Sequence, residues 1–355
     1  MPIDSLKSTW RFHRRSNQKV LDNLALLQSI AYSARDKQEI LDRLHPWRGA
    51  TQALKFYNQF SYIMILLVAI SIVFVTLYLA HYGILLIITW LLGGAAILYA
   101  YFSLESKQDI QKTIELLVEK VYQLQYDIRF HQFPDLDSNV VMNQQYMLTL
   151  VKNRFPNLNE GTYGNEVSTI AATTWQVDGH DYPVLLFKYI KRDRRIGAKN
   201  ENGQEAYIER ILYGACIFDM PALAFVVANQ RKDYVRYPVP WQSSDVQFND
   251  RFKVYGQTEM ELAKNVSGQG LLCLAQNLTH MDGSLIFHEE MSAFCYLSKQ
   301  NIFHCTAPAK PIQSISELRG ALRTLHAPFY EQMQQSLTAI IRGFSDADLL
   351  KSKRR

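Results

Sequence analysis

The sequence predicts an α+β protein with a two-helix transmembrane hairpin, amphipathic juxtamembrane helices, and a cytoplasmic, mainly antiparallel sheet domain with packed helices. Three observations predict it: a long charge-free apolar interval, an apolar heptad repeat directly after it, and strand-like segments separated by turn signals. The chain has 355 residues, 48% of them hydrophobic, and a formal net charge of +5. That length accommodates one soluble domain of about 200 residues beside a membrane segment.

The charge-free interval lies between Lys55 and Glu105 and contains no Asp, Glu, Lys or Arg. It divides into two apolar runs, Phe60–Ala80 and Ile84–Phe102, each close to the roughly 20 residues that a helix needs to cross a bilayer core. Only His81-Tyr82-Gly83 separates them, so we expect two antiparallel helices. Because no charged side chain lies at membrane depth, we do not expect a transporter or channel acting alone.

Basic residues flank both runs, whereas the connecting loop has none. Cytoplasmic flanks retain Lys and Arg, so both termini are expected in the cytoplasm. More than fifty residues precede the first run, which favours an uncleaved anchor over a signal peptide. A cytoplasmic location would keep the four cysteines reduced. The flanking residues are Arg43, Arg48, Lys55, Lys107, Lys112 and Lys120.

Small residues gather on the second run at Gly93-Gly94-Ala95-Ala96 and Ala100. They allow close approach of a neighbouring backbone, either the first run of the same hairpin or a second copy.

Two further segments have helical periodicity. Val20, Leu24, Leu27 and Ala31 form one apolar stripe, and a short helix is expected over Lys37–Leu44. After the hairpin, a heptad seam predicts that the second span continues as one amphipathic helix that ends before Pro134. The seam either packs on the N-terminal helices or dimerises the chain as a parallel coiled coil. It comprises Ile110, Ile114, Leu117, Val121, Leu124 and Ile128.

The second half of the chain alternates strand-like runs with turns. Asp178-Gly179 is a strong hairpin signal, and Thr258 with Glu261 resembles a capping box before a helix over Thr258–Lys264. The expected strands are Ser168–Val177, His180–Ile190, Ala206–Phe218, Ala222–Ala228, Phe252–Tyr255 and Ser284–Glu289.

A further hairpin is expected around a loop at Lys299-Gln300-Asn301, which would place Cys295 opposite Cys305. The pair would be two buried small side chains, with a redox or metal role as the alternative. Ser316 is expected to cap a final helix that bends or restarts at Pro328.

These elements predict five regions: an N-terminal helical segment (1–57), the hairpin (58–103, with spans 60–80 and 84–102), an amphipathic juxtamembrane helix (104–133), the α+β domain (135–345) and a basic tail (346–355).

No Walker loop, dinucleotide-binding glycine pattern, GxSxG elbow or HExxH motif is present. The densest titratable cluster lies between His280 and Glu290. Its candidate catalytic residues are His280, His288 and Glu290. His288 and Glu290 would also form a metal-like pair if they shared a strand face, although polar residues at a hairpin edge give the same cluster. We therefore expect no metal and no cofactor.

Basic residues concentrate in the first fifty or so positions, at Lys191–Arg195 and in the tail Lys351–Arg355. Beside a membrane such clusters contact anionic lipid headgroups. A nucleic-acid partner is not expected, because the positive surplus is small and spread out.

The soluble part resembles a bacterial family known as domain of unknown function 3137, over about residues 150–345. The residues that carry the resemblance are Leu212–Asp219, similar to a small-residue strand of the family in which Tyr213 replaces Phe, then Phe248–Tyr255 with the Glu259–Ala263 helix, and Ser284–Phe287. The resemblance implies a membrane-anchored domain and no established activity. Together with the hairpin it leads us to expect a bacterial inner membrane as the location.

The function expected from these observations is a membrane-anchored binding or scaffolding module with a protein partner or a homo-oligomer. The alternatives are a membrane-proximal hydrolase that uses the His280–Glu290 region and an accessory subunit of a larger membrane complex.

Overall fold

The computed structural model describes residues 15–45, 53–78, 83–136, 149, 152–159, 161–199, 205–228, 236–266, 268–278, 281, 283–306 and 311–352. The chain forms two compact units. The first contains Met1–Leu124 and Ala307–Leu325, and the second contains Gln125–Thr306 and His326–Arg355. A segment from within the predicted 135–345 domain, Ala307–Leu325, therefore belongs to the first unit.

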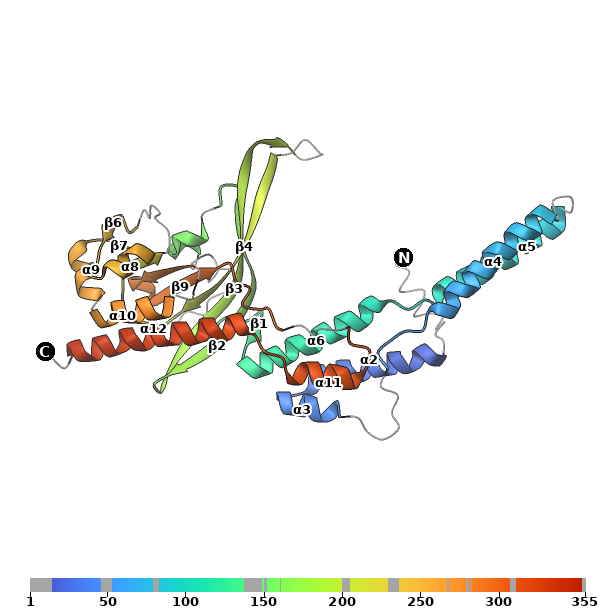
Figure 1. The fold of residues 1–355 in the computed structure, drawn as a ribbon, viewed down its shortest axis with the longest axis horizontal. Coiled ribbons are helices and arrows are strands. Elements are labelled where there is room, and N and C mark those ends of the chain that lie inside the picture. Colours follow the sequence, from blue (N-terminus) through green and yellow to red (C-terminus); the bar gives the residue numbers. More distant parts are fainter. Residues whose placement is uncertain are drawn as a thin grey trace. The chain divides into compact units, whose positions relative to one another are not determined.

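The described elements of the first unit are helical (Figure 1). Their bounds are α2 Arg15–Ser33, α3 Lys37–Arg43, α4 Gln59–Tyr78, α5 Gly83–Phe102, α6 Lys107–Tyr126, whose last two residues fall in the second unit, and α11 Ile315–Arg323. The predicted N-terminal stripe is confirmed, because all four of its residues are buried. The short helix expected after it is confirmed as α3, whose N-cap Asp36 accepts a hydrogen bond from the backbone of Glu39.

The heptad seam packs within its own chain. Ile110, Ile114, Leu117 and Val121 of α6 are buried, and Gln28 of α2 donates a hydrogen bond to Thr113 (3.4 Å). The prediction of one continuous helix is wrong, because α5 ends at Phe102 and Ser103–Ser106 are not helical. Two side chains compete for the backbone at this break: Ser103 bonds the carbonyl of Tyr99, and the Ser106 hydroxyl accepts from Gln108 N.

The cap of α11 is Ser314, not Ser316 as predicted. Its side chain accepts a hydrogen bond from Glu317 N (3.2 Å). Ser314 also forms an antiparallel bridge with Ala53, so the segment before α4 is tied to α11. The predicted restart at Pro328 is confirmed, because the last helix, α12, begins there and runs to Ser352.

The second unit is built on one antiparallel sheet of order β1-β2-β3-β4-β9-β8-β5-β7-β6 (Figure 1). The Asp178-Gly179 hairpin is confirmed, with positive φ at both residues (50° and 82°). The strands are β1 Arg129–Phe130, β2 Gly164–Val177, β3 His180–Lys199, β4 Glu205–Ile217, β5 Phe225–Ala228, β6 Val239–Trp241, β7 Lys253–Gly256, β8 Ser284–His288 and β9 Ala293–Ser298.

The hairpin predicted around Lys299-Gln300-Asn301 is wrong. β9 pairs with β8 and with β4, and residues 301–306 are not a strand. Cys295 therefore lies opposite Cys216 of β4 and Ile286 of β8 rather than opposite Cys305. The connection between β8 and β9 is the short helix η2, Glu289–Met291, followed by Ser292 with φ 44°.

Among the described residues, the α-helices of this unit with defined bounds are α8 Val246–Arg251, α9 Glu259–Asn265, α10 Gly268–Leu278 and α12. The predicted cap of α9 is confirmed, since Thr258 accepts from Glu261 N (3.2 Å). α10 and α12 pack together, and α12 places Phe344 against the stacked rings of Phe225 and Phe287. The Trp175 indole donates to the Tyr330 hydroxyl (3.1 Å), which fixes α12 to β2.

The other face of the sheet carries a second apolar cluster. Phe155 and Leu158, around the short helix η1 Pro156–Leu158, pack with Cys216, Ile286 and Cys295. The ring of His288, one of the candidates from the sequence, packs against Phe155 of this cluster.

Candidate functional site

His288 is the last residue of β8 and is wholly buried. Its ring packs edge-on against Phe155, with 5.8 Å between ring centroids. Neither ring nitrogen has a hydrogen-bond partner among the described residues, and the same holds for both polar side-chain atoms of buried Asn157. An imidazole in this position cannot contact a substrate.

Burial lowers the pKa of His288 to about 4, and the positive charge of Arg236 adds to the effect. Desolvation disfavours the charged imidazolium, and a nearby cation does the same. His288 is therefore neutral at pH 7, with a proton on one ring nitrogen and a lone pair on the other.

Glu290 does not share a strand face with His288, as the metal hypothesis required, because β8 ends at His288 and Glu290 belongs to η2. Its carboxylate is half exposed and pairs with Arg154 and with Arg236, the latter at 3.6 Å. The third candidate, His280, lies outside the described residues. The structure thus places Glu290 in a surface ion-pair group and His288 in the core beneath it.

Cys216 and Cys295 are neighbours across β4 and β9 on the apolar face, and both are fully buried. Burial raises the pKa of each thiol well above its ordinary value. Because the thiolate is the nucleophile, these protonated thiols are inert at neutral pH. Cys305, the partner expected from the sequence, is away from this pair, and burial raises its pKa to about 11.

Sequence reasoning missed Arg154, Asn157 and Arg236. They come from segments far apart in the chain from β8, and no local motif surrounds them. Within the described residues, no group of three or more His, Cys, Asp or Glu side chains is arranged to hold a metal ion.

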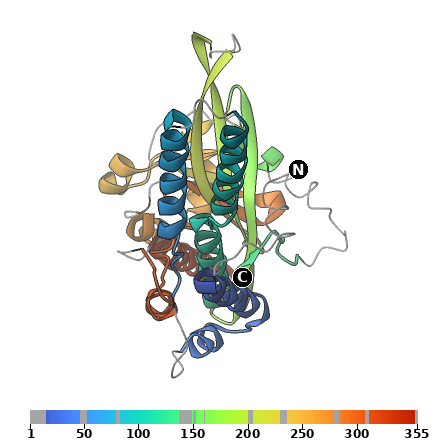
Figure 2. The same cartoon turned by 90° about the vertical axis from the view of Figure 1, so that its right-hand side faces the viewer.

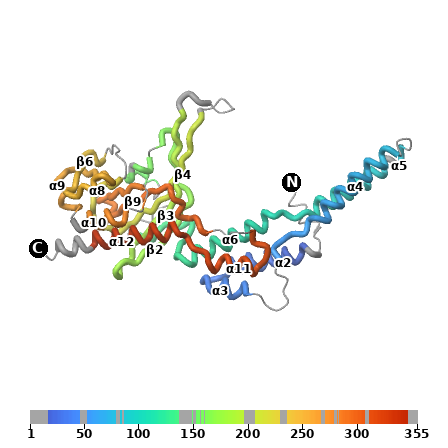
Figure 3. The backbone as a smooth tube through the Cα atoms, viewed as in Figure 1, coloured from blue at the N-terminus to red at the C-terminus, as the bar shows by residue number. Residues whose placement is uncertain are grey.

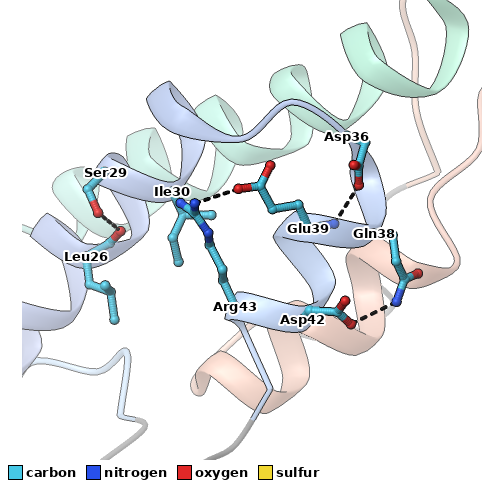
Figure 4. Close-up of a pocket in the computed structure, with 8 residues that line it drawn as sticks. All are labelled: Leu26, Ser29, Ile30, Asp36, Gln38, Glu39, Asp42 and Arg43. Carbon is cyan, nitrogen blue, oxygen red and sulfur yellow. Dashed lines mark hydrogen bonds and ion pairs between the residues drawn. The ribbon is translucent and has the colours of Figure 1, made fainter.

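A shallow pocket of about 760 Å³ lies between α2 and α3 in the first unit (Figure 4). Its acidic side chains already have partners within the helices: Asp36 accepts from Glu39 N, Asp42 from Gln38, and Glu39 pairs with Arg43. These bonds stabilise the turn between the two helices and leave no carboxylate directed at a ligand.

The most distinctive surface of the first unit belongs to α4 and α5. By length and composition both helices can cross a membrane, and they run side by side (Figure 1; Figure 2). Ile72 packs toward Gly93, where an added Cβ would lie 2.5 Å from Ile72 Cδ1. The Trp90 indole donates to Thr76 Oγ1 (3.2 Å), which in turn donates to the carbonyl of Ile72.

The outward surface of this helix pair is apolar. Large hydrophobic side chains that are more than 45% exposed include Leu66, Leu67, Val73, Phe74, Leu77, Ile84, Ile87, Leu91, Leu92 and Leu98. On soluble monomers, apolar patches seldom exceed a few hundred Å².

A polar junction joins the base of the helix pair to α2. The buried side chain of Asn17 accepts from Tyr57 N (2.9 Å) and donates to Asn58 (3.4 Å). Asn58 donates to the carbonyl of Glu105 (2.7 Å) and accepts from its N–H (3.3 Å). The chain therefore enters α4 and leaves α5 at the same place.

Comparison of the chain with protein-family models, curated proteins and solved structures finds no match. The resemblance to domain of unknown function 3137 stays a prediction.

Proposed function

We propose that the chain is a two-pass protein of a bacterial inner membrane, with both termini in the cytoplasm and an α+β unit that acts as a binding or scaffolding module. The observation that carries the anchor is the apolar outward surface of α4 and α5. Two helices of 20 residues match the thickness of a hydrocarbon core, and lipid would cover the side chains that water would otherwise contact.

The junction at Asn58 supports a hairpin that leaves the membrane where it enters. Exposed Lys55 precedes α4 and exposed Lys107 begins α6, so both basic side chains flank the same end of the helix pair. Anionic headgroups stabilise such residues by about 1 kcal/mol each. This placement favours contact with acidic lipids at the cytoplasmic face.

A non-catalytic role of the α+β unit is favoured by the state of the candidate residues. His288 is buried and neutral, and Glu290 is held by two arginines. An active site needs an accessible acid, base or nucleophile within reach of a substrate. His288 is not accessible, and the half-exposed carboxylate of Glu290 is engaged in ion pairs with Arg154 and Arg236. A protein partner, or a second copy of the chain, would instead contact the exposed surface of the sheet.

Reporter fusions test the topology. Alkaline phosphatase, which folds only outside the cytoplasm, should be inactive after Arg355 and active after Tyr82, whereas green fluorescent protein after Arg355 should fluoresce. Active phosphatase at Arg355 would contradict the hairpin.

Cross-linking in native membranes tests the binding role. We expect a defined partner to be recovered with the wild type and with His288→Gln alike, since the buried imidazole makes no surface contact. Recovery of the chain cross-linked only to itself would argue against a partner protein other than a second copy. Loss of the partner from a correctly folded His288→Gln variant would show that the region around His288 takes part in binding.

A further inference from the structure

The outer halves of β3 and β4 form a two-stranded arm that projects from the sheet of the second unit (Figure 3). The last pair of β2 with β3 is Gly164 with Arg192, and the first pair of β9 with β4 is Ser298 with Tyr213. From Glu205 to Leu212, β3 is the only strand of the described chain that pairs with β4. The opposite edge of β4 therefore presents its backbone N–H and C=O groups unpaired by any described strand.

Large apolar side chains are exposed along this open edge. Tyr207, Ile208 and Ile211 are 47%, 45% and 41% exposed. Open edges normally carry devices that block pairing with another chain, such as lysine, proline or a bulge. Lysine and proline are absent between Glu205 and Leu212, and the charged residues there are Glu205, Glu209 and Arg210. The pairing with β3 shifts register between Tyr207 and Glu205. An added strand must therefore adopt a register that keeps like charges from facing one another.

The corresponding edge of β3 is partly closed by the segment before β2. Tyr163 N donates to the carbonyl of Arg192 (2.9 Å), and Arg194 N donates to Thr162 Oγ1 (2.9 Å). The stacked rings of Tyr163 and Tyr207, with centroids 5.0 Å apart, hold that segment against the arm. The edge of β4 is thus the one available for pairing.

We propose that the β4 edge pairs antiparallel with the β4 edge of a second copy, about a two-fold axis at Ile208. In a two-fold antiparallel pair, the residue on the axis faces its own copy, and residues equally far on either side face each other. We take the occupant of the edge to be this chain itself, because this register of self-pairing keeps Glu205, Glu209 and Arg210 from facing like charges. The sheet then continues across the dimer.

Charge selects the register. An axis at Glu209 or Arg210 would set like charges directly opposite, and an axis at Tyr207 would set Glu205 opposite Glu209. Like charges in facing positions destabilise a strand pair. An axis at Ile211 would require Tyr213, which already pairs with Ser298.

An axis at Ile208 avoids these conflicts. It uses Glu205–Ile211, which is nearly the whole open edge, and sets Ile208 against Ile208, Tyr207 against Glu209, and Ala206 against Arg210 of the second copy. Glu209 is already paired with Arg192 of its own chain (3.0 Å), so its charge is balanced beside the incoming tyrosine ring.

A cysteine at the axis tests the register in the full chain in native membranes. Facing Cβ atoms lie about 5 Å apart, close enough for a disulfide after small adjustment. Ile208→Cys should become mostly disulfide-linked dimer on oxidation with copper phenanthroline. Ala206→Cys and Arg210→Cys should not cross-link alone, because each would lie about 13 Å from its own copy, but the two variants expressed together should cross-link to each other.

Met260→Cys, 82% exposed on α9, is the matched control, and the wild type gives the background of the four native cysteines. Cross-linking of Ile208→Cys no greater than that of Met260→Cys would overturn the proposal. Efficient cross-linking of Ala206→Cys alone would overturn the register.

A charged side chain at the two-fold axis tests the dimer without cross-linking. Ile208→Lys should raise the dimer dissociation constant at least about tenfold in detergent, measured by light scattering, whereas Met260→Lys should leave it unchanged. A wild type that is monomeric both in detergent and in native membranes would overturn the proposal. The inference rests on the proposed binding role and names a second copy as the partner. A failed dimer test leaves the topology test and the recovery of a different partner untouched.

Discussion

At the scale of single residues, the core beneath η1 holds polar groups without partners. A buried polar atom that has lost its water costs about 1–3 kcal/mol when nothing replaces the hydrogen bond. His288 and Asn157 each bring two such atoms into the described core. This part of the sheet is therefore less stable than its apolar packing alone would give, and its stability depends on pH.

The pH dependence follows from the sign of the His288 shift. The folded pKa, about 4, lies below the ordinary value of 6.5, so protons bind the unfolded chain more readily. The contribution of His288 to the free energy of unfolding is fully present above pH 6.5 and is lost progressively as pH falls toward 4. From the linkage relation, the loss amounts to about 3 kcal/mol.

Urea unfolding between pH 7 and pH 4 measures this loss. His288→Leu should show a smaller decrease in the free energy of unfolding than the wild type, because it has no group to protonate there. His304→Leu, at an exposed histidine, should follow the wild type. Equal pH dependence of the wild type and His288→Leu would contradict a lowered pKa of His288 in the folded protein.

The helix pair offers a matched test at two adjacent glycines. A Cβ at Gly93 would overlap Ile72, whereas a Cβ at Gly94 meets nothing within 4 Å. Gly93→Ala should destabilise the pair by about 1–3 kcal/mol through overpacking, and Gly94→Ala should not. Thermal unfolding in detergent distinguishes them, and a larger loss for Gly94→Ala would show that the small residues face a different neighbour.

At the scale of elements, the junction connects the helix pair to α2 through side-chain amides. Asn58→Ala removes both bonds to Glu105 and leaves the amide of Asn17 without one partner. We expect a loss of about 1–3 kcal/mol and faster proteolytic cleavage between Leu54 and Asn58. Gln18→Ala, at an exposed residue of α2, is the control. Unchanged cleavage of Asn58→Ala would mean that the junction adds little.

Local patterns predicted most of these elements. The apolar runs, the seam of α6, the Asp178-Gly179 turn and the cap at Thr258 depend on residues within a few positions of each other, so periodicity and turn chemistry identify them. The sequence also contains the signal for the cap of α11, because Ser314 and Glu317 have capping-box spacing.

Strand pairing could not be predicted from local sequence patterns. β9 lies beside β4, which is about eighty residues away in the chain, and no local signal specifies that neighbour. The wrong hairpin made Cys305 the partner of Cys295. The candidate site failed for the same reason: whether His288 is a surface base or a core residue depends on Phe155, a distant segment.

At the scale of the whole molecule, we propose that α4 and α5 hold the chain in a membrane. The junction makes this claim testable by deletion, because Asn58 and Glu105 are hydrogen-bonded to each other. Residues 59–102 can therefore be replaced by a short Gly-Ser linker that joins neighbouring points of the fold. Such a variant keeps both the helices around α6 and the sheet unit.

Extraction of membranes with carbonate at pH 11 tests whether α4 and α5 anchor the chain. The full chain should stay in the pellet until detergent is added, and the variant without residues 59–102 should appear folded in the soluble fraction. Release of the full chain by carbonate, or retention of the deletion variant in the membrane pellet, would contradict the anchor.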